Sequence, residues 1–486
     1  MSEPIAAVPA AVPPASNADR RPLLRRMIDR GLVALIVLSP LPAASVNEWS
    51  VLAIELAAVL MAAAYVLLEP KPRLGAGLAR SLKGTRSLVA GFFAFVGLQV
   101  IPLPAELVRW ISPGAYAFRK LYDPGFARMS FMSLSVAPAR TFEAALELTA
   151  YFIIGFLVLR TVSRGRDMRT LLYVLIGSGA FQALYGLYEL TAARPRILFY
   201  PKVFSLESVT GTFVNRSHLS GYLEVIVPLA VGLLIARMHL FSFGVKGVRE
   251  RLTLMMSQGL AGNLLIGAAV VVMSIGIVLS HSRAGLVVLV SCLLLFVGLS
   301  ALAFGRVRYR ELWVRNFIRV TVLVILAAAL WVGVGTTIQR FALDNLLHED
   351  RPLYWANAAG LVRDFPVFGS GLGTFAAAYP AYEKRGGPEM LLVHAHNDYL
   401  ESLAELGLLG TALLLGLVLV LAIRSYLVWR ERRNPEVKGL VLGGIVALAG
   451  VGIHAVTDFN LHIPANQVLF AVFLTLTFTA AHYRKP

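Results

Sequence analysis

Hydrophobic and polar positions alternate in long blocks along this chain of 486 residues. Apolar runs close to the roughly 20 residues that an α-helix needs to cross the hydrocarbon of a bilayer follow one another from residue 31 onward. They cover residues 31–47, 50–69, 87–103, 141–159, 170–190, 218–236, 262–281, 284–304, 317–335, 402–423, 439–457 and 465–482. The pattern predicts an all-α, polytopic integral membrane protein with about twelve transmembrane helices. Pro40 and Pro42 interrupt the first run, which a kink or a neighbouring helix would have to accommodate.

Clusters of Lys and Arg fall at every second boundary between these runs, on the side that would also hold both termini. They hold 30 of the 45 lysines and arginines and lie at residues 20–30, 71–86, 160–169, 237–251, 306–319, 424–438 and 484–485. Because short basic loops stay in the cytoplasm, this asymmetry predicts that both termini are cytoplasmic.

The largest segment predicted to face outward is residues 336–401, between the ninth and tenth spans. Apolar residues at three- and four-residue spacing predict a helix from Arg351 to Val362 inside it. A turn rich in Pro and Gly follows at residues 365–373 and ends that helix. Two shorter outward segments are expected at residues 104–140 and 191–217.

The domain organisation follows from the same pattern. Residues 1–18 are rich in Ala, Pro and Ser without periodicity, which predicts a disordered cytoplasmic tail. Residues 19–486 are expected to form a single membrane domain. No convincing cleavage site follows the first apolar run, so we expect its helix to be retained and no signal peptide to be removed.

Composition supports a membrane protein and excludes other classes. Hydrophobic residues make up 57%, charged residues only 15%, and the mean hydropathy is +0.70. The formal net charge of +17 could suggest nucleic acid, but Lys and Arg form no stripe or face, and topology explains them better. With Cys292 as the single cysteine, no intramolecular disulfide and no cysteine cluster for zinc can form.

Candidate chemistry is concentrated in the stretch from His394 to Glu401, just before the tenth span. Imidazole is the usual group for proton transfer near neutral pH, so His394 and His396 are candidate catalysts. Asp398 and Glu401 have the D-x-x-E spacing of a capping box, and capping is the interpretation preferred over catalysis for that pair. The glycines at 407 and 410 would allow close helix approach or a bend.

A metal site is a further alternative at this stretch. His394, His396 and Asp398 could supply ligands, but no H-E-x-x-H motif appears, and we expect no metal. The sequence also shows no Walker lysine motif, no dinucleotide fingerprint after a strand and no G-x-S-x-G elbow. Nucleotide-driven or serine-hydrolase chemistry therefore has no support.

Two arginines stand at the outer ends of predicted spans. Arg216 precedes His218 in the stretch 211–218, and Arg283 follows His281 in a polar break between two spans. A guanidinium at a membrane boundary either reaches lipid phosphate or finds an anion within the protein. Two of them, each beside a histidine, predict a shared anion site, and the planar fork of Arg suits a diphosphate.

With these residues in view, the chain resembles the O-antigen ligase family and its relatives, the O-antigen and exopolysaccharide polymerases. The most specific similarity is His396-Asn397, nine residues, and then Gly407-Leu408-Leu409-Gly410. The other similar stretches are residues 211–218 with 221–223, residues 282–285, and residues 351–355 followed by 365–366 and 369–375.

The resemblance implies a metal-independent, inverting glycosyltransferase without a cofactor, in the bacterial inner membrane, with its active site facing the periplasm. A glycan on undecaprenyl diphosphate would move to an acceptor hydroxyl. His396, with His394, would take or position the proton, and Arg216 and Arg283 would hold the diphosphate. Supporting roles fall to Asn215, His218, Arg351, Asn397, Asp398 and Glu401.

Displacement at the anomeric carbon needs a proton acceptor and positive charge near the leaving group, which agrees with these residue types. The acceptor stays open. A ligase of lipopolysaccharide biosynthesis would use a lipid A-core sugar, and a polymerase would use the end of another glycan. Membrane lipids are expected partners and nucleic acid is not. A polytopic transporter or flippase is the alternative from a different class, but its paired halves with broken helices are not evident in the sequence.

Overall fold

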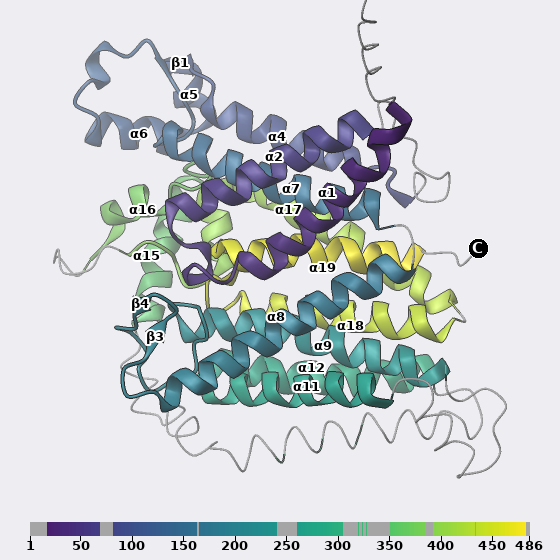
Figure 1. Cartoon of the computed structure of the whole chain (residues 1–486). Coiled ribbons are helices and arrows are strands. Elements are labelled where there is room, and N and C mark those ends of the chain that lie inside the picture. The colour runs from purple at the N-terminus through teal and green to yellow at the C-terminus, as the bar shows by residue number, and fades with distance from the viewer. Residues whose placement is uncertain are drawn as a thin grey trace, which may run out of the picture.

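The computed structural model describes residues 17–68, 81–162, 165–240, 260–304, 319, 323, 327, 350–384, 392–432 and 434–482. Within this part of the chain, long helices run side by side in one bundle (Figure 1). They are α1 (Asn17–Leu38), α2 (Glu48–Leu68), α4 (Thr85–Val100), α7 (Pro138–Thr161), α8 (Gly165–Thr191), α9 (Arg216–Leu240), α11 (Leu260–Leu279), α12 (Arg283–Phe304), α17 (Asp398–Glu431), α18 (Pro435–His454) and α19 (Pro464–His482).

Among the described helices, nine are long and apolar enough to cross a membrane, and they coincide with nine of the predicted spans. These are α2, α7, α8, α9, α11, α12, α17, α18 and α19. The run predicted at 87–103 forms the shorter apolar helix α4, of 16 residues. The span predicted at 317–335 lies almost entirely outside the described residues. A mostly helical polytopic protein is therefore confirmed, and the count of twelve stays a prediction.

The first predicted span, at 31–47, is wrong in its bounds. Helix α1 begins earlier, at Asn17, and ends at Leu38, just before the two prolines. A proline inside a helix removes a hydrogen bond and clashes with the preceding turn, so the helix ends ahead of them. The chain then turns through η1 (Ala43–Ser45), whose three residues all have positive φ. The last two residues of the predicted tail thus belong to α1, and residues 1–16 lie outside the described part.

Proline also marks where helices begin. Pro138, Pro435 and Pro464 are the first residues of α7, α18 and α19. The first N–H of a helix has no partner within the helix, and proline presets the helical φ, so the residue fits there without loss. These positions fix where three of the spans enter the bundle.

Helix α9 forms the centre of the bundle, and its apolar window is entirely buried. Its closest partner is α18, because glycines let the two backbones touch. A Cβ atom on Gly232 would lie 2.4 Å from the carbonyl oxygen of Gly439, and one on Gly443 would lie 2.5 Å from that of Pro228. Small residues at helix interfaces allow this approach, which provides van der Waals contact in a lipid environment.

The short elements gather at one end of the bundle (Figure 1). They are α5 (Ala105–Ile111), α6 (Pro113–Tyr122), α15 (Arg351–Asp364), α16 (Phe375–Ala378) and two small antiparallel ribbons. Strand β1 (Leu103–Pro104) pairs with β2 (Phe131–Met132), with Leu103 opposite Met132. Strand β3 (Arg196–Ile197) pairs with β4 (Tyr200–Pro201), with Ile197 opposite Tyr200. Helix α15 confirms the helix predicted in this loop.

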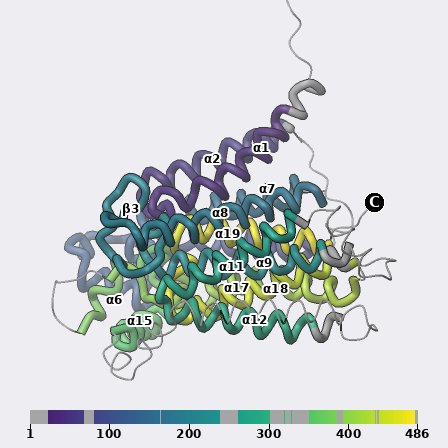
Figure 2. Tube along the Cα trace, turned by 60° about the horizontal axis from the view of Figure 1, so that its bottom comes forward, coloured from purple at the N-terminus to yellow at the C-terminus, as the bar shows by residue number. Residues whose placement is uncertain are grey.

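A separate hydrophobic cluster holds the short elements together beside the ends of the spans. Its buried members include Val108, Leu134, Leu361, Phe365 and Phe375. Figures 1 and 2 show α1 beginning and α19 ending at the opposite end of the bundle. The two ends of the described chain therefore lie on one side, away from the short elements.

Candidate functional site

Three segments that are far apart in the sequence meet at the end of the bundle that carries the short elements. They are the start of α9, the residues just before α17, and the turn between α18 and α19. Phe459 of that turn forms the centre. Its ring stacks on His394 at 4.3 Å and meets His396 and His218 edge-on at 4.7 and 4.6 Å between ring centroids. One aromatic ring thus fixes three imidazoles.

Asp458, the neighbour of this ring, connects the same segments through its carboxylate. Oδ1 accepts a hydrogen bond from the backbone N–H of Phe459 and lies 3.2 Å from Nδ1 of His396 and 3.8 Å from Nε2 of His218. Oδ2 lies 3.6 Å from Nη2 of Arg351 at the start of α15. The carboxylate is buried and has cationic or imidazole groups on both sides.

The charge state of Asp458 follows from these neighbours. Burial alone would raise the pKa of the carboxyl group. The hydrogen bond with His396 and the nearby groups of His218 and Arg351 outweigh burial and hold the pKa of Asp458 well below its usual range. Asp458 is therefore ionised near neutral pH.

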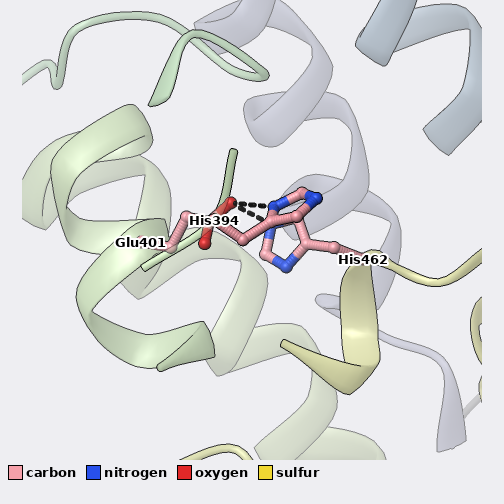
Figure 3. A group of neighbouring side chains, drawn as sticks. All are labelled: His394, Glu401 and His462. Atoms are coloured by element: carbon pink, nitrogen blue, oxygen red, sulfur yellow. Dashed lines mark hydrogen bonds and ion pairs between the residues drawn. The ribbon is translucent and has the colours of Figure 1, made fainter. Parts of the chain in front are cut away.

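His394 also belongs to a second group of polar side chains, in which it lies close to Glu401 and His462 (Figure 3). Nδ1 of His462 lies 2.8 Å from Oδ1 of Asp398, and its Nε2 lies 3.4 Å from Oε1 of Glu401. The same Glu401 oxygen lies 2.7 Å from Nδ1 of His394. Burial disfavours the charged ring, but the charge of Glu401 and the hydrogen bond to Asp398 raise the pKa of His462 to about 10. His462 is therefore an imidazolium that balances two buried carboxylates.

This group also bears on metal binding. Single ligand atoms of His394, Glu401 and His462 lie within 4.8 Å of one another, a spacing that a metal ion could bridge. In the structure the three side chains contact one another directly, with Oε1 of Glu401 between the two imidazoles. The possible metal ligands considered from the sequence, His394, His396 and Asp398, do not form one group in the structure. His396 pairs with Asp458, and Asp398 pairs with His462.

The capping-box interpretation of Asp398 and Glu401 is wrong. The N-cap of α17 is Asn397, whose side chain accepts a hydrogen bond from the backbone N–H of Leu400. Because the cap is supplied one residue earlier, both carboxylates are available to the histidines. Glu401 also accepts from the N–H of Ala395 at 2.7 Å, which fixes the histidine-bearing segment against α17.

Glu405, one turn further along α17, holds the glycine-rich turn of the outer loop. Its two oxygens accept hydrogen bonds from the N–H groups of Gly373 and Phe375 at 2.9 and 2.8 Å. Gly407 then breaks the helical backbone, with φ of +60°, and a Cβ there would lie 2.4 Å from the carbonyl of Val367. The bend expected from the glycines at 407 and 410 is present, and it brings the loop against α17.

Arg216 and Arg283 are the first residues of α9 and α12, which begin side by side. Ser217 follows Arg216, and Ser282 precedes Arg283. The hydroxyl groups of these two serines lie 3.2 Å apart. Asn215 accepts a hydrogen bond from the N–H of Ser217 and so fixes the entry to α9. Both arginines are half-buried. The structure brings these helix starts together, and the assignment of the arginines to a diphosphate stays a prediction.

His218, two residues after Arg216, brings the start of α9 against Phe459 and the other imidazoles. His218 approaches Asp458, which pairs with His396. The backbone oxygen of His218 also accepts from the side-chain amide of Asn466 on α19. Among the residues predicted for the site, each therefore lies at this one end of the bundle.

Sequence reasoning missed Asp458 and Phe459 and gave His462 no role. All three lie in the short break between the last two apolar runs, within Asp458-Phe459-Asn460-Leu461-His462. A carboxylate and an imidazole in so short a break next to two spans is a signal that could have drawn attention to them.

A buried pair lies behind the site, inside the bundle. Nδ1 of His454, the last residue of α18, lies 2.8 Å from Oε2 of Glu224 on α9, and Ser220 donates to the other oxygen at 2.6 Å. A small cavity of about 20 Å³ borders this pair, together with Asn460 and Asn466. Because the backbone oxygen of His454 accepts from the N–H of Asp458, the pair anchors the segment that carries the site.

Fold and site together define a class: a polytopic membrane protein that gathers imidazole, carboxylate and guanidinium groups at one end of its helices. Residues 268–415 match the family described as O-Antigen ligase, which confirms the predicted resemblance over that segment. The segment contains Arg283, Arg351, His394 and His396. The chain is also similar to the exopolysaccharide production protein ExoQ of Rhizobium meliloti (strain 1021). The two are 25% identical over 358 residues, which cover 70% of this chain and 72% of that protein.

Proposed function

We propose that the protein is a membrane glycosyltransferase of the O-antigen ligase type. It moves a glycan from undecaprenyl diphosphate to an acceptor hydroxyl. The observation that carries this proposal is the pair of His396 and ionised Asp458, set at the end of the bundle where two arginine-bearing helices begin. The match to the O-Antigen ligase family supports it.

His396 acts as the base. An ionised carboxylate at Nδ1 favours the tautomer that carries its proton there, which leaves Nε2 as the basic atom. Nε2 takes the proton of the acceptor hydroxyl while the acceptor oxygen bonds to the anomeric carbon. The bond from that carbon to the diphosphate oxygen breaks, and the configuration at the carbon inverts. His396 is about one quarter exposed and returns its proton to water.

Arg216 and Arg283 stabilise the departing diphosphate. Each guanidinium stands at a helix N-terminus, where the helix dipole also favours an anion. Paired arginines neutralise the charge that develops as the bond breaks. The lipid-diphosphate bond is already activated, so the reaction needs no outside energy source, and the two guanidinium groups supply the positive charge without a cofactor or a metal ion.

The remaining groups hold these residues in position. His394 is fixed between Glu401 and the ring of Phe459 and lies beside His396, where it orients the acceptor. Asn215 caps α9, which begins with Arg216, and Asn397 caps α17 directly after the two histidines. Asp398 and Glu401 act through His462, which they keep protonated.

In the cell the protein lies in the bacterial inner membrane, as one domain of residues 19–486 with the loop 336–401 in the periplasm. Both termini are cytoplasmic, in agreement with the basic clusters on that side. The described chain supports this arrangement, because it begins and ends at the end of the bundle opposite the site (Figure 1).

The acceptor is assigned to a lipid A-core sugar, as in a ligase. The named relative favours a second candidate, a polymerase that extends exopolysaccharide or O-antigen, since its name refers to exopolysaccharide production. Both use the same chemistry and differ in the molecule that supplies the hydroxyl. A transporter is less well supported, because the polar groups described gather at one end of the spans rather than at their middle.

The experiment uses the full-length protein in proteoliposomes with a fluorescent glycan on undecaprenyl diphosphate. His396→Ala is expected to lower turnover by at least ~100-fold, the lower range for loss of a general base. His482→Ala, at the far end of α19, is the matched control and should keep full turnover. Turnover by His396→Ala equal to the parent, with equal thermal stability, would remove the proposal. Offering lipid A-core or free glycan as acceptor separates the ligase from the polymerase.

A further inference from the structure

The segment between α8 and α9 folds back along α8 instead of projecting from the end of the bundle. The hydroxyl of Tyr185 donates to the backbone oxygen of Arg196 at 2.7 Å and accepts from the N–H of Leu198 at 2.9 Å. Tyr185 lies six residues before the end of α8 at Thr191, which corresponds to about 9 Å along the helix axis. The β3–β4 hairpin is therefore held beside the final turns of a membrane span.

A buried ion pair fixes the next part of this segment. Nζ of Lys202 lies 3.0 Å from Oε1 of Glu189 on α8, and both side chains are fully buried. The same Nζ donates to the backbone oxygen of Ser208, and Thr210 donates to Glu189. Removing one partner of such a pair would leave an uncompensated charge, so the segment has one well-defined position.

The chain then runs deeper along α8 before it reaches α9. The N–H of Thr212 donates to the side-chain oxygen of Gln182 at 2.9 Å, and the N–H of Val209 donates to the last residue of α11, Leu279. Non-helical backbone at the depth of a membrane is tolerated where it is buried in protein. These contacts meet that condition on the protein-facing side of the segment.

The opposite side of the segment is apolar and exposed. Phe199 at the tip of the hairpin is 84% exposed and Phe204 is 66% exposed. Leu184 and Tyr188 form an exposed apolar stripe on α8, and the Tyr188 ring lies 6.3 Å from that of Tyr185, the residue that holds the hairpin. Because α8 is a candidate span, its exposed stripe faces lipid, and the hairpin continues that lipid-facing surface.

Charged groups border this apolar surface. Arg194 and Arg196 are exposed on the strand side of the turn, and Arg196 donates to the backbone oxygen of Phe199. Aromatic side chains next to arginines are typical of the membrane interface, where rings enter the acyl boundary and guanidinium groups reach lipid phosphate.

We propose that residues 194–206, the hairpin segment, insert into the interface of the surrounding bilayer and bind phospholipid. The apolar tip contacts the upper acyl chains, and the two arginines contact the phosphate groups. Tyr185 and the buried pair of Lys202 and Glu189 hold the hairpin segment at that depth. The hairpin segment is separate from the site formed by His218, His394 and His396. Its proposed role does not depend on the proposed reaction.

The test uses spin-labelled full-length protein in nanodiscs of phosphatidylethanolamine and phosphatidylglycerol. Cys292 is the single cysteine and is buried, so a Cys292→Ser background gives unique labelling sites. Labels are placed by Phe199→Cys and Phe204→Cys. Leu184→Cys, on the exposed stripe of α8, is the lipid reference, and Arg363→Cys, on the exposed surface of α15, is the water reference.

The measured quantity is the depth parameter, the logarithm of the ratio of oxygen to nickel-chelate accessibility. The proposal expects positive values at 199 and 204, close to that at 184, and a negative value at 363. Tyr185→Phe should shift the value at 199 toward water. Values at 199 and 204 equal to that at 363 would overturn the proposal. Low accessibility to both reagents would also overturn it, because a protein partner would then cover the hairpin segment.

Discussion

Nδ1 of His396 lies 3.2 Å from Oδ1 of Asp458, a residue 62 positions later in the chain. The same carboxylate lies 3.8 Å from His218 and 3.6 Å from Arg351, so one acidic group joins the starts of α9, α15 and the segment before α17. Since the surrounding groups keep this carboxylate ionised, it can orient an imidazole and stabilise its protonated form.

Asp458→Asn should therefore impair turnover while leaving the fold in place. The amide has nearly the same shape but carries no charge, so it stabilises the protonated form of His396 less. We expect turnover to fall by ~100-fold or more, within the range for loss of general-base function. The pH profile of kcat/KM should also change, because the negative charge beside the catalytic imidazole is lost.

Asp458→Glu is the matched comparison for Asp458→Asn. Glutamate keeps the negative charge but places it at a slightly different distance from His396. This variant should recover part of the turnover and the parental pH profile. If Asp458→Asn keeps the parental pH profile and loses turnover only in proportion to thermal stability, Asp458 serves the fold alone.

The protonated ring of His462 should make thermal stability depend on alkaline pH. Its folded-state pKa, about 10, lies above the value of about 6.5 expected for an unfolded chain. The stabilisation is therefore fully present below pH 6.5 and is lost as pH rises through 10. Differential scanning fluorimetry from pH 6.5 to 10.5 should show Tm falling more steeply in the parent than in His462→Gln.

Other groups also titrate in that range, so the difference between the two proteins is the quantity that matters. His462→Gln should have the lower Tm at pH 6.5, and the two curves should converge as pH approaches 10.5. Parallel curves across the whole range would contradict a protonated His462.

Sequence reasoning was sound where a single segment carries the information. Apolar runs are local, so most spans and the helix from Arg351 were predictable. The motif histidines were singled out because they lie together just before a span. Pro40 and Pro42 indicated that the first apolar run is interrupted, and α1 ends before both of them.

Pairing between distant segments could not be read from the sequence. The D-x-x-E spacing of Asp398 and Glu401 favoured a cap, although Asn397 directly before them is also a preferred N-cap residue. Their true partner, His462, lies more than sixty residues away. The same holds for Asp458, whose role depends on the turn between α18 and α19 reaching the segment before α17.

Gly407 should be the least replaceable glycine of α17. Its φ is +60°, and a Cβ would lie 2.4 Å from the carbonyl of Val367. Gly407→Ala combines backbone strain of ~1–3 kcal/mol with that clash, so Tm should fall clearly. Gly416→Ala is the control in the same helix, where a Cβ meets nothing within 4 Å, and it should leave Tm unchanged or raise it. Equal effects of both substitutions would contradict the observed bend.

Arg216 and Arg283 should act together on the diphosphate. Arg216→Ala or Arg283→Ala is expected to lower turnover of the lipid-linked glycan by ~100- to 1000-fold, as for loss of an oriented donor to a developing anion. Lysine at either position should recover only part, because it keeps the charge but not the planar fork. Arg363→Ala, an exposed arginine of α15, should leave turnover unchanged. Thermal shift with undecaprenyl diphosphate gives a second readout, since the ligand should raise Tm in the parent and in Arg363→Ala only. A full shift in either alanine variant would remove that arginine from the anion site.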